Sequence, residues 1–323
     1  MVRQKAIQAG FFDQPGERKI HTSPVPRLGG IAIWAGFMLT IGTLLIGFWH
    51  YPHGNAVAGI LAGGTVIFLL GVVDDLYNLS PYVKLVGQFV AALLAFYMGV
   101  QVNTLDLPES MLLVLHSLSL PVTVLWLVGI SNAINLIDGV DGLAGGVITL
   151  SAITLATIAV FTDQPVAALL AAILAGVNLG FLVYNFHPAC IFMGDSGALF
   201  SGFTLGCIAV TGVLKTKVVV MLVVVMIFIL PIADISIAVF RRLLQGKNPF
   251  KPDAEHIHHK LLRAGLGPVK TVVYLYGACI AAGMLVTGYV NYLWNYLLLI
   301  VGACLLATVL IRARKSLHSD LKR

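Results

Sequence analysis

The chain has 323 residues, of which 59% are hydrophobic and only 11% are charged, and its formal net charge is +6. Soluble domains carry roughly 25% charged residues, so this chain has too few charges for a water-covered surface, and lipid must cover much of it. The basic residues lie mostly in short loops between apolar runs, which indicates membrane orientation and excludes a nucleic-acid-binding protein. The four cysteines lack the paired spacing of a disulfide or zinc framework.

Long apolar runs recur along the chain, and a helix needs about 20 such residues to cross a bilayer. We therefore predict an all-α, polytopic integral membrane protein, with residues 1–323 forming a single domain of about ten transmembrane helices. The first residues open no apolar stretch, so we expect no cleaved signal peptide. The fourth span is the weakest, because Pro121 breaks it. The predicted spans are 29–49, 54–73, 82–102, 112–130, 143–162, 165–185, 197–214, 217–240, 269–290 and 292–312.

The basic residues predict which side of the membrane the loops face. With a cytoplasmic N-terminus, only Lys215 and Lys217 of the 20 basic residues fall outside, as the positive-inside rule requires. Most of the acids also fall at the inner face. We therefore expect the working loops on the cytoplasmic side of the membrane, the largest of them being residues 241–268.

Asp74 and Asp75 directly follow the second apolar span. Adjacent carboxylates repel each other, and at a helix C-terminus they face the negative end of the dipole. We favour a functional role beside a cation such as Mg²⁺ or a lysine over a role as polar end-markers. Lys84, in the first turn of the next predicted helix, is either a snorkelling lysine or the partner of a phosphate or carboxylate.

Four polar residues recur at every third position: Asn132, Asn135, Asp138 and Asp141. On a continuous helix Asn132 and Asp141 would point in opposite directions. The neighbouring glycines predict a helix break near Gly139, which would let all four line one cavity. Amides and acids suit recognition of a nucleobase or sugar, and oxygen ligation of Mg²⁺. The alternative is a polar capping segment.

Asn185-Phe186-His187-Pro188 and Met193-Gly194-Asp195-Ser196-Gly197 enclose a short loop. Serine proteases also contain Gly-Asp-Ser-Gly, but they need a β-barrel and separate His and Asp partners. An acid where a glycine-rich turn meets a helix fits a metal ligand beside a phosphate site better. A plain N-cap is the alternative. Asp234 lies roughly 10 Å inside its span, and we expect it to pair within the bundle.

The largest predicted inner loop contains the tract from Pro252 to His259, flanked by basic residues. A histidine-rich tract suggests zinc. However, neither a cysteine nor a spaced acid completes a tetrahedral site nearby, and the basic setting would repel a cation. We favour contact with phosphate, and a solvated loop is the alternative.

Together these motifs resemble the polyprenyl-phosphate N-acetylhexosamine-1-phosphate transferases, over about residues 10–265. Each motif alone is weak, but their order on alternate loops is specific. The first-loop and histidine motifs look like the branch that uses UDP-N-acetylglucosamine to initiate teichoic-acid linkage units, enterobacterial common antigen and O-antigens. The motifs are Arg18-Lys19-Ile20-His21 with Pro26-Arg27-Leu28-Gly29-Gly30, Asp74-Asp75, the segment Asn135 to Asp141, Met193-Gly194-Asp195, and His256-Ile257-His258-His259.

The resemblance implies an enzyme of the bacterial inner (plasma) membrane that transfers GlcNAc-1-phosphate from UDP-GlcNAc to undecaprenyl or another polyprenyl phosphate and releases UMP. It implies Mg²⁺ as cofactor, with Mn²⁺ as a substitute, and leaves a homodimer open. The implied metal ligands are Asp195 and Asn135. The implied catalytic residues are Asp74, Asp75 and Lys84. The implied substrate-binding residues are Asn132, Asp138, Asp141, Asn185, Arg242, His256, His258 and His259.

The role of Asp74 and Asp75 stays open at this point. A base that deprotonates the lipid phosphate is one possibility. Yet the second pKa of a phosphate monoester is near ~6, so the nucleophile is mostly dianionic at neutral pH. Orientation of the nucleophile, of the lysine or of the metal is an equally good role for either carboxylate.

Two departures from the family pattern stand out. Relatives usually begin with another transmembrane helix, so a natural variant and a truncated start both stay open. Many relatives also have a basic residue where Ala254 stands, so we expect Lys251 or Lys260 to supply that phosphate contact. The nearest alternative function is the same reaction with another UDP-N-acetylhexosamine or with UDP-MurNAc-pentapeptide. A secondary transporter is the rival class, but transporters place their acids near the midplane in repeated halves.

Overall fold

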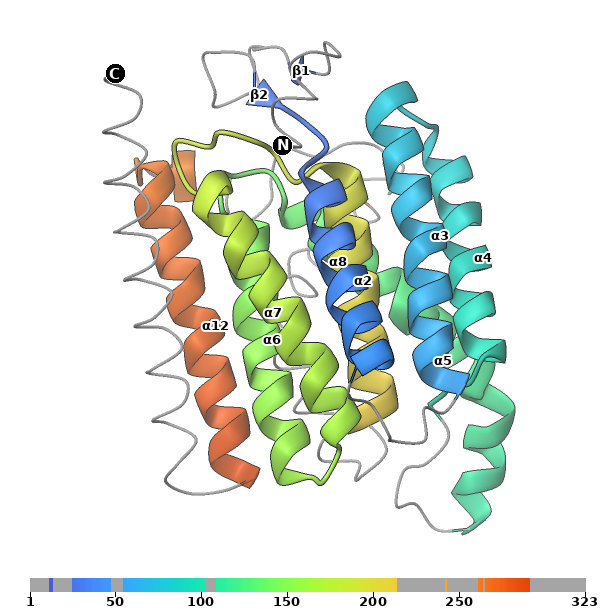
Figure 1. The fold of residues 1–323 in the computed structure, drawn as a ribbon. Coiled ribbons are helices and arrows are strands. Elements are labelled where there is room, and N and C mark those ends of the chain that lie inside the picture. Colours follow the sequence, from blue (N-terminus) through green and yellow to red (C-terminus); the bar gives the residue numbers. More distant parts are fainter. Residues whose placement is uncertain are drawn as a thin grey trace.

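The described part of the chain is a bundle of helices that run roughly along one axis (Figure 1). The structure, a computed structural model, describes residues 12–13, 25–47, 55–102, 109–213, 242, 261–263 and 265–290. Apart from the helices, these residues contain one antiparallel pair of very short strands, β1 (Phe12–Asp13) and β2 (Val25–Pro26). The predicted all-α class is therefore confirmed for the body of the protein.

Eight of the predicted spans correspond to helices. These are α2 (Gly29–Gly47), α3 (Asn55–Tyr77), α4 (Pro81–Tyr97), α5 (Glu109–Ile137), α6 (Leu143–Phe161), α7 (Pro165–Asn185), α8 (Gly194–Ile208) and α12 (Pro268–Val290). A π-helical turn, η1 (Ala209–Val213), continues α8. Six helices of the described residues are long and apolar enough to cross a membrane, and α4 is a shorter apolar helix. The protein is thus a polytopic membrane protein. Predicted spans 217–240 and 292–312 lie outside the described residues, so the count of ten stays a prediction.

Helix α5 departs most from its predicted bounds. The prediction that Pro121 breaks this span is wrong, because α5 passes through Pro121 and continues beyond residue 130 to Ile137. Proline removes one backbone N–H, and helices in membranes tolerate this because neighbouring groups re-satisfy the freed carbonyl. The break predicted near Gly139 is confirmed as the turn between Ile137 and Leu143 that joins α5 to α6.

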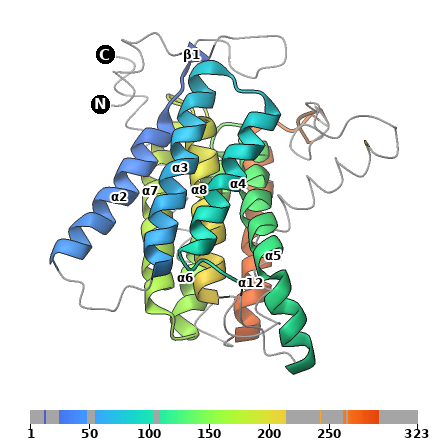
Figure 2. The same ribbon diagram turned by 90° about the vertical axis from the view of Figure 1, so that its right-hand side faces the viewer.

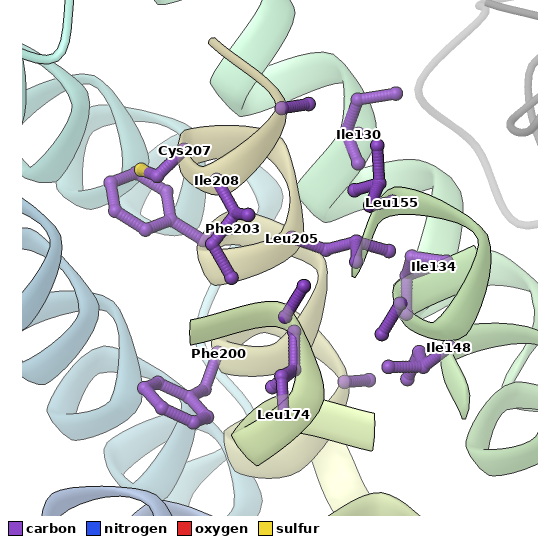
Figure 3. Close-up of a cluster of buried hydrophobic side chains, with 14 of the residues drawn as sticks. Ile130, Ile134, Ile148, Leu155, Leu174, Phe200, Phe203, Leu205, Cys207 and Ile208 are labelled. Carbon is purple, nitrogen blue, oxygen red and sulfur yellow. The ribbon is translucent and has the colours of Figure 1, made fainter. Parts of the chain in front are cut away.

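Helix α8 lies at the centre of the bundle. Every residue from Ser196 to Ile208 is buried, and α8 packs against α2, α3, α5, α6 and α7. Figure 3 shows Phe200, Phe203 and Leu205 of α8 projecting toward side chains of the surrounding helices. The bundle therefore fixes the position of the α8 N-terminus, where Asp195 lies.

The loops that carry the predicted acids share one end of the bundle. Successive helices alternate in direction, so the C-terminal ends of α3, α5 and α7 meet the N-terminal ends of α4, α6 and α8 at the top of Figure 1. Helices α3, α4 and α5 follow one another side by side (Figure 2). The end of the bundle at which these loops gather is called the loop end below.

Three glycines let α2 and α3 approach α8 closely near the loop end. A Cβ atom at Gly71 of α3 would lie 2.5 Å from Ser196 Cα. A Cβ atom at Gly30 of α2 would lie 2.2 Å from the Gly197 nitrogen, and Gly197 in turn faces the Gly30 backbone. Backbone contact at these distances is compatible only with glycine, as in other tightly packed membrane helices. These contacts set the distance between α3, which carries Asp74 and Asp75, and the first turn of α8.

Replacing Gly71 should separate α3 from α8. We expect Gly71→Ala to destabilise the protein by about 1–3 kcal/mol, because an added methyl group in a filled interior forces the backbones apart. The measurement is the thermal unfolding midpoint of the detergent-solubilised protein. Gly42→Ala is the matched control, because a Cβ atom at Gly42 has nothing within 4 Å. Equal midpoints for the two variants would contradict this account of the interface.

Candidate active site

Lys84 and Asp195 contact each other at the loop end of the bundle. The Lys84 ammonium group bonds to Asp195 Oδ2 and also pairs with Asp74 Oδ2 at 2.6 Å. Asn135 of α5 donates from Nδ2 to Asp195 Oδ1 at 3.0 Å. The structure therefore brings together four of the predicted residues, from α3, α4, α5 and α8. The Asp195 side chain retains 29% exposure and Lys84 21%, so both remain accessible to a small charged ligand.

Asp75 caps the N-terminus of α8. Its Oδ1 accepts the Asp195 backbone N–H at 2.8 Å, and its Oδ2 accepts the Ser196 N–H at 3.0 Å. The first N–H groups of a helix have no partner within the helix, and leaving such a buried group unpaired costs about 1–3 kcal/mol. A carboxylate also interacts favourably with the positive end of the α8 dipole. Both oxygens of Asp75 thus hold the backbone that carries Asp195.

Asp74 shapes the connection between α3 and α4. Its Oδ1 accepts the Leu79 N–H at 2.7 Å, while Oδ2 pairs with Lys84. Helix α4 then starts with Ser80 as N-cap, whose hydroxyl accepts the Val83 N–H at 3.4 Å, and with proline at the first position. This N-cap and proline order is the usual start signal of a helix. It places Lys84 close to the last turn of α3.

The first-loop motif docks directly on the loop that precedes α8. The Gly29 and Gly30 N–H groups donate to the carbonyls of Phe192 and Met193, both at 2.9 Å, and the Phe192 N–H donates to the Pro26 carbonyl at 2.9 Å. Two segments of the sequence resemblance, far apart in the chain, thus form one hydrogen-bonded unit that supports Asp195.

The turn between α5 and α6 brings two more acids to the loop end. Desolvation raises the pKa of the Asp138 carboxyl well above its usual range, and the charges of Asp195, Asp75 and Asp141 raise it further, whereas Arg27 lowers it. Asp138 therefore lies within electrostatic reach of these acids and of the first-loop arginine. Among the residues that the structure describes here, these acids outnumber the cations Lys84 and Arg27 that offset them.

Asp141 is held by the loop that follows α7. Its Oδ2 lies 2.8 Å from His187 Nδ1 and accepts the Ala189 N–H at 3.1 Å. His187 has no predicted role, because a single histidine in a short loop forms no sequence pattern that reveals its partner. The structure assigns it as the neighbour of Asp141.

Asn185 and Asn132 are engaged with other parts of the protein. Asn185 is buried, accepts the Gly142 N–H at 3.1 Å and donates to the Ile191 carbonyl at 3.0 Å, so its amide joins the two loops. The Asn132 amide exchanges hydrogen bonds with Gln88 of α4. Their predicted substrate contacts stay predictions.

The remaining predicted contacts concern the second half of the chain. Arg242 is part-buried and interacts with another group of the protein, so its predicted contact with substrate stays a prediction. His256, His258, His259 and Asp234 lie outside the described residues. In the described part of the second half of the chain, the Tyr276 hydroxyl of α12 donates a hydrogen bond to the Gly142 carbonyl at 2.5 Å. This bond attaches α12 to the turn that carries Asp138 and Asp141.

The fold and the site define a class: a polytopic membrane enzyme with an acid-rich, lysine-containing site at one end of its helix bundle. A family model described as glycosyl transferase family 4 matches residues 57–213. The chain is 37% identical over 278 residues to a "Probable undecaprenyl-phosphate N-acetylglucosaminyl 1-phosphate transferase" of Bacillus subtilis, covering 85% of this chain and 76% of that protein.

Two further relatives agree with this class. A "Decaprenyl-phosphate N-acetylglucosaminephosphotransferase" of Mycolicibacterium smegmatis is 33% identical, with 87% of this chain and 76% of the relative covered. An "Undecaprenyl-phosphate alpha-N-acetylglucosaminyl 1-phosphate transferase" of Escherichia coli is 31% identical, with 82% and 72% covered. The chain belongs to the polyprenyl-phosphate N-acetylglucosamine-1-phosphate transferase family of glycosyl transferase family 4.

Removing the Asp75 carboxylate that caps α8 should lower the stability of the folded protein. We expect Asp75→Leu to lower the free energy of unfolding by at least about 1–3 kcal/mol, because two buried N–H groups of α8 lose their acceptor. Asp75→Asn should have an intermediate effect, since its single oxygen accepts only one of them. Thermal unfolding in detergent with EDTA measures the change.

Asp138→Asn is the control for this experiment. Because desolvation and neighbouring acids raise the Asp138 pKa, folding disfavours its ionised form relative to the unfolded chain, and the neutral amide should leave the unfolding midpoint unchanged or higher. A midpoint for Asp75→Leu equal to that of the wild type would remove the capping role.

Proposed function

We propose that the protein transfers GlcNAc-1-phosphate from UDP-GlcNAc to undecaprenyl phosphate at the cytoplasmic face of a bacterial plasma membrane, as the first membrane step of a cell-envelope glycopolymer. An oxygen of the lipid phosphate attacks the β-phosphorus of UDP-GlcNAc. The bond from that phosphorus to the oxygen bridging the two phosphates breaks, and UMP leaves with the oxygen. The products are lipid-linked pyrophosphoryl GlcNAc and UMP. The names of the Bacillus subtilis and Escherichia coli relatives support both the sugar and the type of lipid.

The observation that carries the proposal is the convergence of Lys84, Asp195 and Asn135 at the part-buried start of α8. Phosphoryl transfer needs positioning and neutralisation of charge more than covalent chemistry. Lys84 is a mobile point charge suited to a phosphate oxygen, and its present partners, Asp74 and Asp195, hold it at the loop end. An incoming diphosphate would compete for this ammonium group.

The donor chemistry of the site fits Mg²⁺. Among the described residues no group of three His, Cys, Asp or Glu side chains forms a ready-made metal cage. Mg²⁺, however, typically uses one or two protein carboxylates together with substrate phosphates. Asp195 and the amide oxygen of Asn135 would hold the ion, and the surplus of acids around Asp138 would favour a cation there. When bound, the ion would neutralise the charge that develops on the diphosphate.

Positioning is the role that we assign to both carboxylates of the Asp74-Asp75 pair. Asp75 holds the α8 backbone and Asp74 holds Lys84 and the Leu79 N–H. Every carboxylate oxygen of the pair is thus already engaged in the protein. Because the lipid phosphate is mostly dianionic above pH ~6, the attack needs no protein base.

Purified protein should release UMP when undecaprenyl phosphate and UDP-GlcNAc are both present. The experiment compares UDP-GlcNAc with UDP-GalNAc, UDP-glucose and UDP-MurNAc-pentapeptide, and UMP release is the signal. Release should stop with EDTA and return with Mg²⁺ or Mn²⁺. Asp195→Asn should lose at least ~100-fold, since a metal ligand contributes several kcal/mol.

Each result of this assay has a defined meaning. Preference for another UDP-sugar would replace the proposed donor while leaving the family reaction intact. Full activity in EDTA together with full activity of Asp195→Asn would remove both the metal and Asp195 from the reaction.

Two matched positions can test which side of the membrane the loop end faces. Asn78 and Asp163 are both exposed, both have positive φ (50° and 52°), and they lie in loops at opposite ends of the bundle. In a background without the native cysteines, Asp163→Cys should react with an impermeant thiol reagent in intact cells. Asn78→Cys should react only after permeabilisation. The opposite pattern would place the loop end outside the cytoplasm.

A further inference from the structure

Four polar side chains of α4 and α5 lie in two layers. In the first layer, Lys84 of α4 and Asn135 of α5 both contact Asp195. Gln88 follows Lys84 by four residues and Asn132 precedes Asn135 by three, so each shares a helix face with its site residue. Because α4 leads away from the loop end and α5 leads toward it (Figure 2), Gln88 and Asn132 both lie deeper, by about 6 Å and about 4.5 Å respectively.

The second layer consists of the two amides alone, here called the Gln88–Asn132 pair. Gln88 Nε2 donates to Asn132 Oδ1 at 3.1 Å, and Asn132 Nδ2 donates to Gln88 Oε1 at 2.5 Å and to the Val128 carbonyl at 2.8 Å. Gln88 is only 1% exposed, on a helix of otherwise apolar buried residues. Two amides that bond in both directions fix the distance and the rotation between their helices, because each has a partner only at one register.

We propose that the Gln88–Asn132 pair is a positioning device for the transfer reaction, which sets the register of α4 against α5 so that Lys84 and Asn135 reach Asp195 together. The inference rests on the proposed function for its kinetic readout. An isolated buried amide would be costly in the membrane interior, and a reciprocal pair removes that cost. Gln88 is therefore assigned a role through Lys84, and Asn132 a role through Asn135, rather than by contact with substrate.

The experiment exchanges the two amides. Gln88→Asn shortens one side of the pair and Asn132→Gln lengthens the other, so each single variant breaks the match, while the double variant restores the combined length. We expect each single variant to lower kcat about 10-fold or more with little change in KM, on the scale of a lost buried hydrogen bond. The double variant should recover to within about threefold of the wild-type kcat.

A second readout needs no substrate. Amine acylation of Lys84, followed by mass spectrometry, should be faster in both single variants, because a displaced lysine loses its carboxylate partners. The double variant should return to the wild-type rate. This measurement separates the two ideas: a wild type that turns over none of the UDP-sugars would refute the proposed function, while the acylation rates would still decide on the pair.

Asn178→Gln is the matched control. Asn178 is another fully buried amide, bonded to the Leu174 carbonyl and to the Ser201 hydroxyl of α8, and it contacts none of the site residues discussed above. We expect it to leave kcat and the Lys84 acylation rate within about threefold of wild type. Single variants with wild-type kcat and acylation, a double variant no better than the singles, or an equal loss in Asn178→Gln would each overturn the proposal.

Discussion

The site depends on a helix that begins inside the bundle. The first N–H groups of α8 need acceptors in a region where water is scarce, and the Asp75 carboxylate accepts two of them. Because α8 is enclosed over its whole length from Ser196 to Ile208, the surrounding helices fix where this end lies. Lys84, Asn135 and the first-loop segment are all placed relative to it. The position of Asp195 is therefore a property of the whole bundle.

This arrangement concentrates negative charge. Asp74 and Asp195 share Lys84, whereas Asp138 is surrounded by other acids, and the charge of Arg27 partly offsets them. Like charges brought together in a partly desolvated site cost free energy, and in the described part of the chain the acids of this site outnumber the cations placed with them. Its substrates, a diphosphate and a lipid phosphate, are themselves anionic in this family. A site that must gather anions on top of its own acids needs mobile positive charge, which is the electrostatic reason to expect a metal ion beside Lys84.

Hydropathy predicted most helix bounds within a few residues, because lipid imposes a minimum apolar length. The glycines of the Asp138–Gly142 turn and the Gly194 start of α8 also indicated where site residues would lie. The sequence alone could not predict which side chains form hydrogen bonds with one another. Gln88 is a single polar residue in an apolar run, and only the packing of α4 on α5 reveals that it meets Asn132. The continuation of α5 through Pro121 likewise went against the local preference of proline, which the sequence pattern alone had taken as a break.

The motifs of the first loop and of the segment before α8 acquire a common explanation from their backbone contacts. Gly29 and Gly30 bond to Phe192 and Met193, and Gly30 also meets the Gly197 backbone. A side chain at Gly30 would push α2 away from α8, and loss of the backbone bonds would free the loop that leads to Asp195. These residues therefore influence the position of Asp195 through backbone contacts. Glycines set how close the helices come, and backbone bonds together with Asp75 hold the end of α8 that carries Asp195.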